Sequence, residues 1–216
     1  IMMLHPNTKY CRVVNGKNGK VLSVKIGNKY EQPLDEAYDM DFNYRNDSIP
    51  GTGYLRMELK SDAGPFSTKD YLIMLRVVGL DGNRSFMHLS YSLGYGFVAR
   101  TAMKVYLATI GRDKVGFTRL DNPPGTEPCY IRGLRGVVER NTMRYYLAIE
   151  AFLNSTYVPP DKQLNRRLAR WFDATEKYAR QLHEMNRQEY LHMKHEEFQR
   201  FQSMKGQVVL QDDPKR

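Results

Sequence analysis

The feature that most constrains the fold is a series of alternating segments within residues 36–119. In residues 38–45 the large apolar side chains occupy every second position, which is the period of a strand with one buried face. Residues 97–110 then have the apolar composition of a buried helix. We therefore predict an α+β fold in which a curved antiparallel sheet grips an apolar helix. The other predicted strands of this meander are 54–60, 71–78 and 85–93.

Further elements flank this meander. A glycine-rich turn at 15–19 joins residues 9–14 and 21–26 into a hairpin. Apolar spacing predicts a helix over 137–154 and, after Pro159 and Pro160, one long helix from Asp161 to about Met204. The predicted organisation is a sheet-and-helix domain at 1–155, a helical extension at 156–206 and a disordered tail at 207–216.

Composition narrows the class of protein. Hydrophobic residues make up 41% of the 216 residues, which is enough for a packed core. No run of about 18 apolar residues occurs, so we expect no membrane-spanning segment. The net charge of +9 is spread out, and we interpret it as a contribution to solubility, with anionic lipid, nucleic acid or an acidic protein as alternatives. Residues 1–4 resemble the end of an upstream element, so we expect the domain to lack its N-terminal part.

Cys11 and Cys129 are the only cysteines. One disulfide between them would suit an oxidising compartment and would stabilise the fold by about 4–5 kcal/mol in the chain-entropy model. Two free thiols are an equal alternative, and a bond from Cys11 to a cysteine upstream of this chain is a third. No CxxC motif occurs, so we expect no redox or zinc chemistry through cysteine.

Large, flexible apolar side chains recur on the predicted strands. We expect the gap between sheet and helix to hold a cavity lined by them, with one histidine that could contact a polar headgroup, although a purely structural histidine is the simpler interpretation. No nucleophile motif or complete phosphate loop accompanies them, so we predict no enzyme activity and no cofactor. The predicted ligand-binding residues are Met40, Phe42, Met57, Met74, Met87, His88 and Tyr106.

The predicted long C-terminal helix divides into two halves. Its first half carries a stripe that we expect to dock on the domain, formed by Leu164, Leu168, Trp171 and Phe172. Its second half is sparsely apolar, which favours burial by another chain or a second copy. Glu189, His192 and Glu196 share one face there, but a solvated face explains them better than a metal site. The predicted partner-binding residues are Tyr190, Met193, Phe198 and Phe201.

Four long motifs carry a resemblance, at residues 60–71, 90–96, 111–117 and 135–146. They resemble a family of uncharacterised proteobacterial secreted or periplasmic proteins with a START-like (helix-grip, SRPBCC) domain. The resemblance implies a signal peptide and a first helix upstream of this chain, and a place in the bacterial envelope. It implies no activity, because none is established for the family.

These patterns together favour non-catalytic binding of a hydrophobic or amphipathic, lipid-like ligand in the envelope. The alternative is a structural accessory subunit of a larger envelope assembly that docks through its C-terminal helix. A hydrolase or cyclase that uses the pocket is a third possibility. We expect no nucleic-acid partner, because no nucleic-acid motif accompanies the arginines and tyrosines of residues 132–146.

Overall fold

The computed structural model shows an α+β fold, with a six-stranded antiparallel sheet followed by helices in the C-terminal part. The predicted fold class is confirmed at this level. The predicted helix at 97–110, which includes Tyr106, lies outside the described residues except for Arg100 and Thr101, which are helical. The structure describes residues 1–17, 19–49, 51–81, 84–96, 100–101, 112–121, 125 and 127–211, with side chains up to residue 204.

The sheet is a meander in which each strand pairs with the next one along the chain. The predicted hairpin at its start is confirmed, because Gly16 pairs with Gly19 across a tight turn. Gly19 has a φ of 124°, a conformation that glycine adopts without steric cost. The strands are β1 (Thr8–Gly16), β2 (Gly19–Ile26), β3 (Tyr38–Asn46), β4 (Tyr54–Ala63), β5 (Thr68–Gly79) and β6 (Ser85–Tyr95).

Short elements and helices complete the described fold. The predicted helix at 137–154 is confirmed as α2 (Gly133–Leu153). No helix in the described part of the chain is both long and apolar enough to cross a membrane. The other elements are the 3-10 turns η1 (Met2–Leu4), η2 (Leu34–Glu36) and η3 (Pro65–Ser67), the small hairpin β7 (Arg119–Leu120) and β8 (Cys129–Tyr130), and the helices α3 (Pro160–Glu176), α4 (Ala179–Leu182) and α5 (Arg187–Gln211).

The prediction of one uninterrupted helix from Asp161 to Met204 is wrong. The helix ends at Glu176, a single turn forms α4, and a new helix begins at Arg187. Asn186 starts α5 through a reciprocal capping box: its side chain accepts a hydrogen bond from the Glu189 amide at 2.9 Å, and the Glu189 carboxylate accepts one from the Asn186 amide at 3.2 Å. An Asn-x-x-Glu start signal therefore lies inside the region that apolar spacing alone assigned to one helix.

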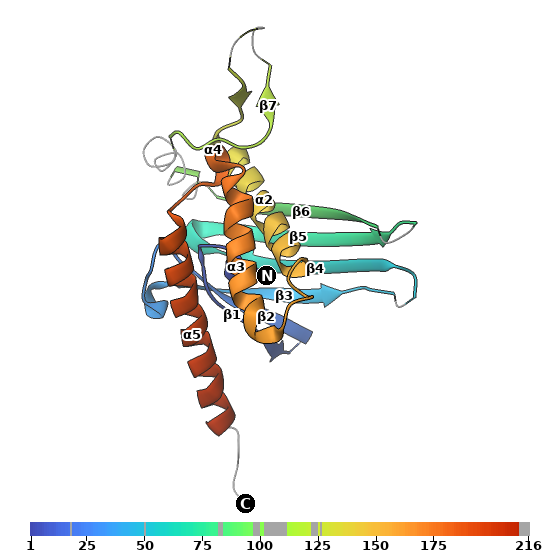
Figure 1. The fold of residues 1–216 in the computed structure, drawn as a ribbon, viewed down its shortest axis with the longest axis vertical. Coiled ribbons are helices and arrows are strands. Elements are labelled where there is room, and N and C mark those ends of the chain that lie inside the picture. Colours follow the sequence, from blue (N-terminus) through green and yellow to red (C-terminus); the bar gives the residue numbers. More distant parts are fainter. Residues whose placement is uncertain are drawn as a thin grey trace, which may run out of the picture.

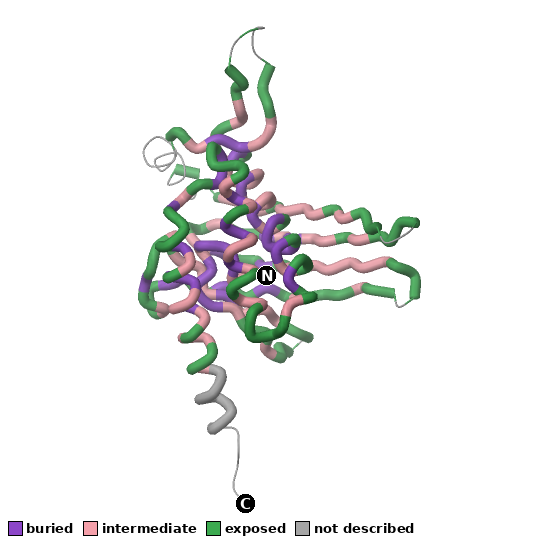
Figure 2. The backbone as a smooth tube through the Cα atoms, viewed as in Figure 1, coloured by how far each residue is buried: buried purple, intermediate pink, exposed green. Residues whose placement is uncertain are grey.

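The helices cross one part of the sheet and leave the rest uncovered. Figure 1 shows α2 and α3 side by side across the strands, and α5 beyond them. The ends of β3, β4, β5 and β6 that approach the β3–β4 and β5–β6 connections extend away from all three helices. Buried residues gather beneath the helices, whereas the extended ends of β4, β5 and β6 are partly buried or exposed (Figure 2). The sheet therefore has a covered half and an open half.

Two hydrophobic clusters hold these layers together. One lies on the covered half of the sheet, around Val24, Met40 and Ile73, with Tyr145 of α2 packed against it. The other joins the N-terminal Leu4 to residues of α2, α3, α4 and α5. It includes Leu168, Trp171 and Phe172, which confirms the predicted docking stripe. Because this second cluster unites residues from both sides of the expected boundary at 155/156, the extension shares a core with the first 155 residues.

Candidate functional site

Strand register divides the predicted ligand-binding residues between two faces of the sheet. Directly paired residues place their side chains on the same face. Met57 pairs with Leu75, whereas the next residue, Glu58, pairs with Met74. Met57 and Met74 therefore lie on opposite faces. Ile73 shares the face of Leu75 and packs in the cluster that contacts α2, so Met57 is on the helix side and Met74 is on the reverse side.

The same argument separates Met87 from His88 on β6. Met87 pairs with Val77 on the helix side, and His88 pairs with Arg76 on the reverse side, where it is exposed. The expectation that all the predicted residues line one gap is therefore wrong for Met74 and His88. For Met74 the physical reason is that residues 71–78 are apolar at nearly every position, so alternation does not reveal which face is covered. His88 directly follows Met87 in the same strand, so alternation alone places it on the opposite face.

Met40 and Phe42 lie on the helix side of β3 and are almost fully buried, at 4% and 3% exposure. They pack with Val24, Tyr71 and Ile73 in one hydrophobic cluster. The Phe42 ring meets the edge of Tyr71, with centroids 6.4 Å apart. In the described part of the chain these two side chains thus contribute to a packed core.

The open half of the sheet carries a partly exposed apolar surface on its helix side. Two cross-strand rows form it, because Met57 pairs with Leu75 and Leu75 with Leu89, while Leu55 pairs with Val77 and Val77 with Met87. All six side chains are of intermediate burial. This apolar shelf, as we call it, continues the covered cluster outward and consists of Leu55, Met57, Leu75, Val77, Met87 and Leu89.

The two cysteines are free thiols. The alternative of a Cys11–Cys129 disulfide is therefore wrong for this structure. Cys11 is partly buried beside the sheet cluster, and Cys129 is exposed on the β8 strand of the small hairpin. Burial raises the pKa of the Cys11 thiol to about 11, which keeps it protonated and unreactive at neutral pH.

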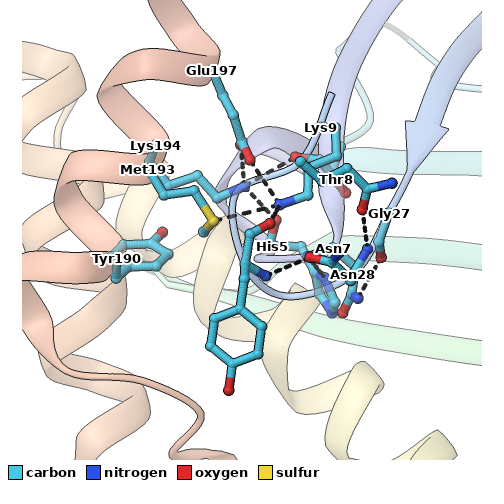
Figure 3. Close-up of polar contacts among 12 residues, drawn as sticks. His5, Asn7, Thr8, Lys9, Gly27, Asn28, Tyr190, Met193, Lys194 and Glu197 are labelled. Atoms are coloured by element: carbon cyan, nitrogen blue, oxygen red, sulfur yellow. Dashed lines mark hydrogen bonds and ion pairs between the residues drawn. The ribbon is translucent and has the colours of Figure 1, made fainter. Parts of the chain in front are cut away.

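A buried ionic network joins α5 to the first strand (Figure 3). Lys9 of β1 and Lys194 of α5 both contact the carboxylate of Glu197, at 2.9 Å and 2.7 Å, and all three side chains are about 1% exposed. The remaining ammonium protons have partners too. Lys9 donates to the Tyr30 carbonyl at 2.6 Å and to the Met193 sulfur at 3.4 Å, and Lys194 donates to the carbonyls of His5 and Thr8 at 2.8 and 3.0 Å. Such complete pairing indicates a structural role, not a catalytic one.

His5 lies beside this network and is 5% exposed. Its ring stacks on Tyr145, with centroids 5.3 Å apart. Burial, together with the nearby cations Arg144 and Lys194, holds the pKa of His5 well below its usual value. His5 is therefore neutral at physiological pH, and its Nδ1 accepts a hydrogen bond from the Asn7 amide at 3.2 Å.

A second ionic cluster surrounds Glu184, in the segment between α4 and α5. Its carboxylate contacts Lys29 at 2.6 Å, Lys114 at 3.0 Å and the buried guanidinium of Arg144. Burial by itself raises the pKa of Glu184, but the three cations together lower it below its usual value. This carboxylate therefore ties three distant parts of the chain to the α4–α5 connection.

The predicted partner-binding residues pack on their own fold. Tyr190 and Met193 are 1% and 3% exposed in the helical core, and the Tyr190 hydroxyl donates to the Leu4 carbonyl at 2.8 Å. Phe201 meets Tyr10 of β1, with centroids 5.5 Å apart, and Phe198 meets Phe201. The prediction that another chain buries this surface is wrong for Tyr190 and Met193, because α5 folds back along the edge strand β1.

Sequence reasoning missed Lys9, Lys194 and Glu197. A signal was present for two of them, because Tyr190, Lys194, Glu197 and Phe201 follow the 4-3-4 spacing of a single helical stripe. Charged residues within a buried stripe indicate an internal ion pair, but their partner Lys9 lies 188 residues away from Glu197.

Within the described residues, no three His, Cys, Asp or Glu side chains lie close enough to hold a metal ion. The candidate trio of Glu189, His192 and Glu196 does not form such a group. Comparison of the chain with protein-family models, curated proteins and solved structures finds no match. Proposals about function therefore rest on the chain's own residues and on the resemblance of its four motifs given above.

Proposed function

We propose that this protein binds the apolar part of a hydrophobic or amphipathic molecule, without catalysis, on the apolar shelf. The observation that carries the proposal is the continuous six-residue apolar surface left partly exposed beyond the helices. Contiguous apolar patches on soluble proteins commonly mark binding sites. Two of the six residues are methionines, whose flexible side chains adapt to ligands of irregular shape.

The chemistry of the shelf favours binding over catalysis. Its six side chains, from Leu55 to Leu89, contain no ionisable group. On this proposal the shelf contributes about 25 cal/mol for each Å² of apolar surface that the ligand covers. A polar headgroup would remain at the rim, in contact with water.

We also propose that the domain is START-like and acts in the bacterial envelope. The family resemblance supports both points. The packing of α2 on the sheet, where the ring centroids of Tyr145 and Tyr91 are 6.0 Å apart, is compatible with a helix-grip arrangement. Residues 97–110 remain the other candidate for the gripped helix. The shelf would then be the open mouth of the space between sheet and helix.

Fluorescence titration with 11-(dansylamino)undecanoic acid tests the shelf. Leu75→Glu and Met87→Glu place a carboxylate on the shelf and should weaken probe binding by about tenfold or more, since each tenfold corresponds to only about 1.4 kcal/mol. Met74→Glu and His88→Glu are matched controls, because each changes the neighbouring residue on the reverse face. Equal loss in both pairs, or no saturable binding by the unmodified protein, would refute the proposal.

A second candidate function is that of an accessory subunit, which would dock through an exposed apolar row on the sheet and not through the C-terminal helix. Ile49, Tyr54, Val78 and Phe86 form a cross-strand row at the tip of the sheet, since Ile49 bridges to Tyr54, Tyr54 pairs with Val78 and Val78 with Phe86. Ile49 and Phe86 are 57% and 59% exposed. Native mass spectrometry of the protein from its own cells, compared with a Phe86→Ser variant, tests it: a stoichiometric partner lost in the variant supports docking there.

A further inference from the structure

A separate hollow lies between the β7–β8 hairpin and the junction of α3 and α4. Its residues fall between 117 and 181, and none of them belongs to the apolar shelf. Its volume is about 380 Å³, within the range of small-molecule sites. Figure 1 shows α4 beneath the projecting hairpin. The lining residues are Phe117, Arg119, Tyr130, Lys177, Tyr178, Ala179, Arg180 and Gln181.

The charged side chains that line this hollow are all positive. Arg119, Lys177 and Arg180 are cations, and no carboxylate is among the described residues that line the hollow. The acidic residues nearest to Lys177 and Arg180 in sequence have other contacts, because Glu176 lies 3.0 Å from His183 and Glu184 contacts the three cations described above. In the described part of the chain, Arg119, Lys177 and Arg180 form no ion pair with an acid. The hollow is therefore built to attract an anion.

Aromatic rings and a buried amide complete the site. Tyr178 is 40% exposed, and its ring packs edge-on against Phe117 with centroids 5.5 Å apart. The Arg180 guanidinium lies 5.0 Å from the centre of the Tyr130 ring. Gln181 is only 7% exposed yet lines the hollow, and its side-chain amide has no hydrogen bond to the described residues. An amide with unused donors and an unused acceptor can hydrogen-bond to the polar edge of a ligand.

We propose that this hollow binds a small organic phosphate that carries a planar ring, of the mononucleotide class. Arginine and lysine side chains contact phosphate oxygens through charge-assisted hydrogen bonds. A planar base stacks on an exposed tyrosine ring or on an arginine guanidinium, and such stacking tolerates any base. In this arrangement Lys177 and Arg180 hold the phosphate, Tyr178 supports the ring, and Gln181 hydrogen-bonds to its edge.

Isothermal titration calorimetry of the full chain tests the proposal with four probes: AMP, adenosine, ribose 5-phosphate and inorganic phosphate. We expect AMP to bind at least about tenfold more tightly than any of the other three, because only AMP combines a phosphate and a ring. Arg180→Gln and Lys177→Gln should each weaken AMP binding by about fivefold to tenfold, and Tyr178→Leu by about fivefold. AMP affinity should also fall as salt is raised.

Lys162→Gln is the matched control, since it removes one charge from the exposed opposite end of α3. Lys177 is exposed as well, so its substitution should leave the melting temperature unchanged and isolate binding from folding. AMP binding no tighter than that of inorganic phosphate, or equal effects of Lys177→Gln and Lys162→Gln, would overturn the proposal. Tighter binding of a single-stranded oligonucleotide than of AMP would overturn the assignment to a small ligand.

Discussion

At the scale of single residues, Glu197 compensates two buried cations. Lys9 and Lys194 both depend on its carboxylate, and neither is accessible to water. Burial lowers the pKa of Lys194, and the attraction of Glu197 partly offsets this effect. The network therefore holds α5 against β1 only when Lys9, Lys194 and Glu197 are all present.

Glu197→Gln should leave the two lysines without their countercharge. Breaking a buried ion pair by removing one partner costs about 3–5 kcal/mol, so we expect a loss of this size in the free energy of unfolding. Urea denaturation measures it. Glu196→Gln is the control, because Glu196 is less buried and has no ion pair among the described residues, and its effect should stay within about 0.5 kcal/mol. Equal midpoints for the two variants would show that the network does not hold α5.

His5 should make the protein sensitive to mild acid. The unfolded chain takes up a proton on this histidine near its usual pKa of about 6.5, whereas the folded chain resists protonation to well below that value. The stability contributed by His5 is therefore present above about pH 6.5 and is lost as the pH falls toward the folded pKa, at up to about 1.4 kcal/mol per pH unit. Denaturation curves between about pH 7.5 and pH 5 should show this slope, and His5→Asn should flatten it. An unchanged slope in the variant would contradict the assignment.

At the scale of elements, α5 protects an edge of the sheet. β1 is the first strand in the sheet order and so has no neighbouring strand on one side. α5 contacts it through the Lys9–Glu197 pair and the Tyr10–Phe201 rings. Covering an edge strand prevents it from pairing with another chain. The role expected for a partner is thus performed by the chain's own helix.

Truncation after Arg180 should consequently unfold or aggregate the protein, although the sequence predicts a separate sheet-and-helix domain at residues 1–155. The cut removes Tyr190 and Met193 from the helical core and exposes the β1 edge. Loss of a cooperative thermal transition, followed by circular dichroism, is the expected result. Truncation after Met204 is the control, because it retains the α5 side chains that contact the helical core and β1, among them Tyr190, Met193, Glu197 and Phe201. A folded, monomeric product of the shorter cut would contradict this account.

At the scale of the whole molecule, α2 packs on one face of the sheet and α3 packs on α2. Met40 and Met74 test this arrangement, because they lie on opposite faces and are chemically identical. Met40→Asp places a charge in a packed cluster and should cost more than about 3 kcal/mol, whereas Met74→Asp should cost less than about 1.5 kcal/mol. Guanidinium denaturation compares them. Equal losses would indicate that both faces are covered.

Several features of the fold follow from local pattern. Alternation at 38–45 and 54–60 predicted two strands of the meander, glycines at 15–19 predicted the first hairpin, and apolar spacing predicted α2. These signals are local, because the repeats of two residues for a strand and 3.6 residues for a helix can be recognised within a few consecutive residues. The chain order of the strands also sufficed to predict an antiparallel sheet.

The tertiary structure decided what local pattern cannot encode. Which side of β5 faces the helices depends on register with β4, so only the pairing separated Met74 from Met57 and Met87. An amphipathic stripe is the same whether it meets its own chain or another, so the burial of Tyr190 and Met193 required the position of α5. The sequence by itself determined the strands of the meander, the first hairpin and α2. Three features depended on how the chain folds back on itself: the contact between residues 9 and 197, the covering of β1 by α5, and the basic hollow. Each joins residues that are far apart in the sequence, and no local periodicity predicts such contacts.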